Sequence, residues 1–242
     1  MPLRTIKMAF FLFLTIYFQI LLSAKIAYIP LENILKNVSL ICLGSLGDLT
    51  LSYNAGVAAG YILKNEGYDA YVVGVLDSLS IDDKEPFHRV NSSAFITAHV
   101  YSLFSKGLLT AGVIPLFNGK IIDTEIIYSL NTRNATYPIF VESELELKKI
   151  KEMGYKGTVI LKEDLEDYID KIKLFWKIKS LNTEDIRIKI LKNSAIWLGG
   201  EKKIYINEIF RESGLIIFSK DILDYAQDVL DGYKQPTGRK PW

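Results

Sequence analysis

Three charged residues, Lys162, Glu163 and Asp164, follow directly on a short apolar run at residues 158–161. When a strand of an α/β protein ends in carboxylates, these lie at the carboxyl edge of the sheet, where such folds bind their substrates. A carboxylate in that place can attack as a nucleophile or transfer a proton. Glu163 and Asp164 are therefore the candidate catalytic residues of the sequence.

The same two carboxylates also have a purely structural interpretation. They open a predicted helix over residues 163–178. Acidic side chains in a first helical turn cap free N–H groups and interact favourably with the helix dipole, for about 0.3–1 kcal/mol each. That role requires no substrate, so both interpretations stay open.

Two further polar residues, Asp77 and His88, lie in a loop region after another predicted strand and are candidates for binding a substrate. Asp77 ends a β-branched run at residues 70–76, where a carboxylate could bind a ligand or cap a turn. His88 lies in the loop expected at the mouth of the site. His99, by contrast, is expected to be packed within a helix.

Alternating apolar and amphipathic segments must position these side chains. Strands are predicted at residues 38–44, 70–76, 109–117, 158–161 and 215–218, and helices at about 48–65, 92–106, 143–154, 163–178, 183–193 and 219–232, with 121–138 ambiguous. Ser143 and Glu146 have the spacing of a capping box. This alternation predicts right-handed βαβ units and a parallel sheet, either doubly wound or closed as a (β/α)8 barrel. No Gly-x-Gly-x-x-Gly follows a strand and no Walker sequence is present, which favours the barrel.

Composition limits the classes of function. The chain has 242 residues with 29 basic and 28 acidic side chains, a net charge of +1 that gives no indication of nucleic-acid binding. One cysteine, Cys42, excludes an intrachain disulfide, and with two histidines it disfavours a classical zinc site. No metal or organic cofactor is predicted.

The first 24 residues differ from the rest. Arg4 and Lys7 precede an apolar run at residues 8–22, and small residues follow up to Ala24. This is the layout of a secretory signal peptide or, if it is not cleaved, of a membrane anchor through residues 8–22. A buried strand and helix, or a mis-assigned start, is the alternative.

The leader sets the expected domains and location. One domain is expected over residues 25–232 with a flexible tail at 233–242, in a secreted or membrane-anchored extracellular protein, the alternative being cytoplasmic. Three Asn-x-Ser/Thr triplets would permit glycosylation outside the cell, at Asn37, Asn91 and Asn134.

Four stretches, taken in order, resemble the N-terminal domain of glycoside hydrolase family 3, which contains β-glucosidases and β-N-acetylhexosaminidases. They are "LGSLGDLTLSYNAGVAAGYILKNEGYDAYVVGVLD" (43–77), "KEPFHRVNSSAFITAHVYSLFSKGLLTAGVI" (84–114), "EMGYKGTVILKEDL" (152–165) and "ESGLIIFSKDILDYAQDVL" (212–230). The resemblance covers roughly residues 40–232 with gaps. It implies an incomplete or degenerate TIM-type barrel, carbohydrate as a ligand, and glycosidic-bond hydrolysis.

The catalytic positions depart from that family's pattern. Glu163 stands where the family has its nucleophilic aspartate, and Lys162 replaces the small residue beside it. Pro115 and Leu116 replace a Lys-His pair that holds the sugar. Glu85 stands where the family has an arginine, and Arg89 follows four residues later. In the next loop, Asp123 is present but no histidine accompanies it, so the resemblance implies Arg89 and Asp123 as candidates for binding the substrate.

Because several positions are lost together, we expect weak or absent hydrolysis, as in a pseudoenzyme of carbohydrate metabolism. The alternative function is a non-catalytic secreted or membrane-anchored module that binds carbohydrate or takes part in assembly. An active glycosidase that uses Glu163, and a generic βαβ similarity without common function, are the remaining interpretations. No oligomeric state is predicted.

Overall fold

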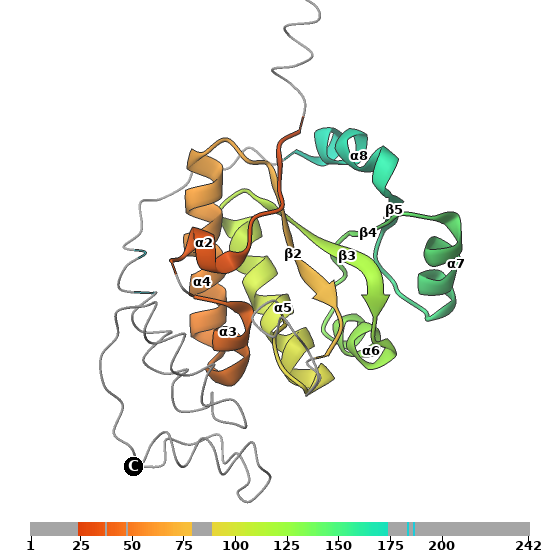
Figure 1. Cartoon of the computed structure of the whole chain (residues 1–242), viewed down its shortest axis with the longest axis horizontal. Helices are drawn as coiled ribbons and strands as arrows, with labels where there is room; N and C mark the ends of the chain where they lie inside the picture. The colour runs from red at the N-terminus through yellow and green to blue at the C-terminus, as the bar shows by residue number, and fades with distance from the viewer. Residues whose placement is uncertain are drawn as a thin grey trace, which may run out of the picture.

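The computed structural model describes residues 24–36, 38–46, 48–78 and 89–173, together with Thr183 and Ile186. Within these residues the chain forms an α/β fold around a single parallel sheet (Figure 1). Several predictions lie outside the described residues: the leader up to residue 23, His88, the strand at 215–218, the helix at 219–232 and the tail.

Five strands form the sheet in the same order as they occur in the chain, and every neighbouring pair is parallel. They are β1 (Ile26–Ala27), β2 (Ala70–Leu76), β3 (Ile114–Ile122), β4 (Ile139–Val141) and β5 (Val159–Leu161). Among the described residues β1 and β5 do not pair, so the sheet is open. The predicted α/β class and parallel sheet are confirmed, whereas a closed barrel is not.

Helices connect the strands and cover the sheet. They are α2 (Leu31–Ile34), α3 (Leu40–Leu46), α4 (Leu49–Asn65), α5 (Ala94–Thr110), α6 (Thr124–Thr132), α7 (Glu144–Glu152) and α8 (Leu165–Ile172), with a 3-10 turn, η2 (Lys162–Asp164), before α8. The predicted capping box is confirmed at α7, where Ser143 and Glu146 satisfy each other's backbone N–H groups. None of the helices among the described residues is long and apolar enough to cross a membrane.

Successive side chains of a strand point to opposite faces, and the two faces of this sheet have different cores. Tyr71 and Phe117 belong to the core that also contains α3 to α7. Ile114 and Phe140 point the other way and pack with Leu165 and Ile169 of α8, among others. A closed barrel would enclose this second face, but here α8 lies on it, which is the physical reason that the barrel prediction does not describe this part of the chain.

Helices α4 and α5 approach each other through small residues. A Cβ atom at Gly56 would lie 2.0 Å from the backbone oxygen of Phe104, and one at Gly107 would lie 2.3 Å from that of Tyr53. No side chain larger than hydrogen fits at either position without moving a backbone. The small residues of α4 and α5 therefore permit the close packing of the two helices.

Other elements differ from their predictions. The apolar run at 38–44 is not a strand, because Leu40–Leu46 forms helix α3; a short, wholly buried apolar run has no period that separates the two. Helix α5 continues to Thr110, so β3 begins only at Ile114 and extends to Ile122. Strands β1 and β4 were not predicted, because two or three residues are too few for a pattern.

Candidate functional site at the carboxyl edge

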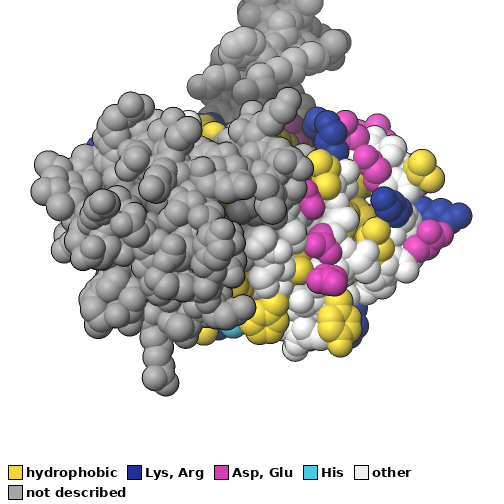
Figure 2. Space-filling view, turned by 60° about the horizontal axis from the view of Figure 1, so that its bottom comes forward, with side chains coloured by type: hydrophobic (Ala, Val, Ile, Leu, Met, Phe, Trp, Pro, Cys, Tyr) yellow, Lys and Arg dark blue, Asp and Glu magenta, His cyan; other side chains and the backbone are white. Residues whose placement is uncertain are grey.

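The carboxyl ends of β2 and β3 bring together two of the predicted binding residues. Asp77 follows β2 and Asp123 follows β3, and because the strands are parallel both lie at the same edge. The Asp123 N–H donates to the Leu76 carbonyl at 2.7 Å, which fixes the two strand ends against each other. Figure 2 turns this edge forward and shows carboxylates close to exposed hydrophobic side chains on the described surface.

Asp77 uses both of its carboxylate oxygens. Oδ1 accepts the backbone N–H of Ser78 at 2.9 Å, and Oδ2 lies 3.4 Å from Nη2 of Arg89. The two side chains are 30% and 17% exposed, respectively, so the ion pair is half-buried and reaches solvent. The two interpretations of Asp77, a turn cap and a ligand-binding residue, are therefore compatible with each other.

Asp123 joins the same group through Ser78. Its Oδ2 accepts the Ser78 hydroxyl at 2.7 Å, and its Oδ1 accepts the Glu125 N–H at 2.8 Å, which caps helix α6. Asp77, Ser78, Arg89 and Asp123, which we term the carboxyl-edge cluster, thus come from three separate segments. Ser78 was not singled out in the sequence, because a serine in a polar loop carries no signal of its own.

A buried phenol lies close to this cluster. The Tyr101 hydroxyl donates to the Val75 carbonyl at 2.7 Å and occupies the space in which a Cβ at Gly74 would lie. Burial raises the pKa of Tyr101; the nearby charges of Arg89 and Asp77 lower and raise it, respectively. The phenol therefore stays neutral. It holds the end of β2 through its hydrogen bond to Val75 and its packing against Gly74.

The predicted catalytic residues lie elsewhere on the described surface. Glu163 and Asp164 are exposed in η2, and neither Leu161 nor Asp164 makes a side-chain cap at the helix starts that follow them. Beside them, the Lys162 ammonium lies 3.1 Å from Glu142 in an ion pair that is more than half exposed on both sides. Among the described residues, no hydrogen bond or ion pair found joins Glu163 or Asp164 to the carboxyl-edge cluster. The same residues contain no group of three or more His, Cys, Asp or Glu that could hold a metal ion.

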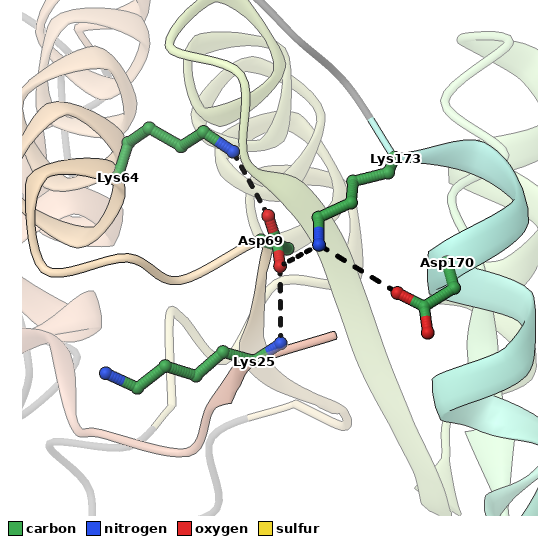
Figure 3. Close-up of polar contacts among 5 residues, drawn as sticks. All are labelled: Lys25, Lys64, Asp69, Asp170 and Lys173. Carbon is green, nitrogen blue, oxygen red and sulfur yellow. Dashed lines mark hydrogen bonds and ion pairs between the residues drawn. The ribbon is translucent and has the colours of Figure 1, made fainter. Parts of the chain in front are cut away.

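A second polar cluster lies at the opposite, amino edge of the sheet and was missed in the sequence (Figure 3). Asp69 precedes β2 and is nearly buried. Its carboxylate oxygens lie 3.2 Å from the Lys64 ammonium and 3.0 Å from that of Lys173, and the Lys25 backbone N–H donates to it at 3.3 Å. Burial alone would raise the pKa of Asp69, but bonds from Lys173, Lys25 and Lys64 hold it below its ordinary value.

A hollow of about 330 Å³ opens where β1 ends and β2 continues. Apolar side chains and the rings of Tyr28 and Tyr71 line it, and Glu32 is the charged residue among those described there. It does not gather polar side chains from separate elements, so the carboxyl edge is the stronger candidate site.

Comparison with known proteins gives one distant relationship. No family model matches the chain, and no solved structure matches it. The chain is similar to the tRNA uridine 5-carboxymethylaminomethyl modification enzyme MnmG of Clostridium kluyveri, with 26% identity over 189 residues. The matching region is 72% of this chain and 27% of that enzyme, so the chain spans about a quarter of the relative's length.

This relationship corrects the predicted family. A tRNA modification enzyme does not fit glycoside hydrolase family 3, so the predicted membership, glycosidic hydrolysis and pseudoenzyme interpretation are wrong. The alternative of a carbohydrate-binding or assembly module is not supported either. The expected role in carbohydrate metabolism is wrong for the same reason, and nothing found shows a signal peptide.

Proposed function

We propose that this chain is a ligand-binding α/β domain that holds a small zwitterion, such as a free amino acid, at the carboxyl-edge cluster. One observation carries the proposal. A guanidinium and two carboxylates from separate segments meet at the carboxyl ends of β2 and β3, where open parallel sheets bind ligands. A zwitterion has the complementary charges, an anionic group for Arg89 and an ammonium for Asp77 and Asp123.

The strength of the Asp77–Arg89 pair is compatible with exchange for a ligand. A partly exposed ion pair with atoms 3.4 Å apart is worth about 0–1 kcal/mol. A ligand that replaces this contact with two charge-assisted hydrogen bonds, each shorter, therefore gains more than it displaces.

The test is isothermal titration calorimetry of the full chain with the twenty free amino acids, supported by thermal unfolding. At least one amino acid is expected to bind and to raise the melting temperature, as a ligand specific for the folded state must. Arg89→Gln and Asp123→Asn are expected to abolish that binding. Lys162→Gln is the matched control, because it removes a cation from an exposed pair at the same edge.

Two results would overturn the proposal. One is the absence of heat and of any thermal shift across the panel with folded wild-type chain. The other is equal affinity in the wild type and in folded Arg89→Gln.

A second candidate function, a role in tRNA modification, is favoured by the 26% identity to a tRNA uridine modification enzyme. The shared region is about a quarter of that enzyme, so its whole activity is not transferred. A mobility-shift titration of the full chain with total tRNA tests this candidate. A complex that forms at low salt and is displaced by unlabelled tRNA is expected, and no complex at low salt would reject the candidate.

A further inference from the structure

An aromatic ring and a guanidinium are stacked on the surface where α5 meets the end of α6. Phe95, in the first turn of α5, is 61% exposed, and the Arg133 guanidinium carbon lies 4.3 Å from the centre of its ring. One face of the ring is thus covered by a cation. Most of the remaining ring surface is open to solvent, which makes Phe95 one of the most exposed large hydrophobic residues described.

The guanidinium is held in place from two sides. Nη2 of Arg133 lies 3.2 Å from Nδ1 of His99, one helical turn after Phe95. Since the guanidinium can only donate, Nδ1 is the acceptor and the imidazole proton is on Nε2. Nε of Arg133 is buried and has no hydrogen-bond partner among the described residues.

The helix that carries Phe95 has no acidic side chain, since α5 contains no aspartate or glutamate over its 17 residues. Its exposed cation, Lys106, is eleven residues after Phe95, on the same face of the helix and about 16 Å away along its axis. Phe95 thus has the Arg133 guanidinium on one face of its ring and Lys106 further along the same helix. The acidic Glu125 lies in the first turn of α6, eight residues before Arg133.

We propose that Phe95, Arg133 and Lys106 form a contact surface for unpaired RNA, with one base stacked on the open face of Phe95 and phosphates at the two cations. Single-stranded nucleic acid is bound by this combination of aromatic or guanidinium planes and a basic track. The chain's net charge of +1 does not oppose such a contact, because the attraction depends on charge close to the strand. The inference is independent of the carboxyl-edge ligand and would supply the RNA contact that the second candidate function requires.

The experiment is fluorescence anisotropy of the full chain with a labelled single-stranded 12-nucleotide RNA of mixed sequence, and with the blunt duplex of that sequence. The single strand is expected to bind more tightly than the duplex, with affinity that falls as salt rises. Phe95→Leu keeps an apolar side chain but removes the ring, and it is expected to weaken binding about 5- to 150-fold, the range of one base–aromatic stack.

Two further variants separate stacking from folding. Phe95→Tyr keeps the ring and is expected to retain the wild-type affinity, whereas Arg133→Lys keeps the charge and loses the planar group, so its binding is expected to weaken. Tyr28→Leu is the control, since it removes an equally exposed ring that packs against Phe140 elsewhere on the sheet. Circular dichroism establishes that each variant is folded.

Three outcomes would overturn the proposal: no RNA binding by folded wild-type chain at low salt, unchanged affinity in folded Phe95→Leu, or duplex affinity equal to that of the single strand. If amino-acid binding at the carboxyl edge fails while the single strand still binds through Phe95, the failure belongs to the ligand proposal alone. If total tRNA fails to bind but the single strand binds, only the tRNA candidate is rejected.

Discussion

The two edges of the sheet use similar residues in opposite ways. At the amino edge, the Asp69 carboxylate is 10% exposed and is surrounded by Lys64, Lys173 and the Lys25 backbone (Figure 3). At the carboxyl edge, Asp77 is 30% exposed and its ion pair with Arg89 is longer, at 3.4 Å. Asp69, whose carboxylate has several short contacts, is held in one position. Asp77, which has a long ion pair and access to solvent, can exchange its partner.

This difference predicts that the cluster at the amino edge contributes to stability and the cluster at the carboxyl edge to binding. The lowered pKa of Asp69 means that the folded state favours its charged form, so the amino edge stabilises the fold. A surface pair such as Asp77–Arg89 contributes little to folding. The carboxyl-edge cluster is therefore where substitutions should change binding, and the amino-edge cluster is where they should change stability.

The largest expected effect is that of Asp69→Asn. It leaves the Lys64 and Lys173 ammonium groups without their shared anion and is expected to lower the free energy of unfolding by about 2–3 kcal/mol, below the full value for a completely buried pair because both lysines reach solvent. Urea denaturation followed by circular dichroism measures it. Asp77→Asn, the same change at the other edge, should cost less than about 1 kcal/mol. Equal losses in the two variants would remove the distinction between the edges.

Lowering the pH should remove part of the stability that the Asp69 carboxylate contributes. The pKa of Asp69 is lower in the folded chain than its unfolded value near 3.8. Its contribution is therefore fully present above that value and is lost as the pH falls through the folded pKa. Stability measured from pH 5 down to pH 2 should decline less steeply in Asp69→Asn than in wild type. An unchanged slope in Asp69→Asn would argue against a buried ionised Asp69.

A smaller effect, about 1 kcal/mol, is expected for Asp123→Ala, which removes the cap of α6. Ser143→Ala is the matched control, because it removes the cap of α7 without touching the carboxyl-edge cluster. Any loss beyond that of the control measures the Ser78–Asp123 hydrogen bond. If Asp123→Ala were as stable as wild type, Asp123 would not be a cap in solution.

Local signals in the sequence predicted much of the fold. The β-branched run at 70–76 is β2, and the Ser143–Glu146 box starts α7, because each of these depends on neighbouring residues alone. Whether the sheet closes depends on contacts between distant segments, and the position of α8 over Ile114 and Phe140 has no local signature. The barrel prediction could not be tested within the sequence for that reason.

The site was predictable only in part. Asp77 was named from its place after a strand, whereas Arg89 and Asp123 were named from a family resemblance that proved wrong. The fold nevertheless brings the three residues together at one edge. The Asp69 cluster was missed, because its two lysines come from α4 and from the end of α8, far apart in the chain. The stack of Phe95 on Arg133 was missed for the same reason, since α5 and α6 meet only in the folded chain.

The sequential order of the five strands has a consequence for how the chain is made. Each strand pairs with the one before it, so no strand must wait for a later one to find its neighbour. The sheet can grow at one side while the ribosome adds residues, at about 5–20 per second, and each new helix covers what has just formed. The cluster around Asp69 is the exception, because Lys173 follows α8 in the chain. Lys173 can therefore contact Asp69 only after β5 and α8 have been synthesised, although Asp69 itself is made much earlier.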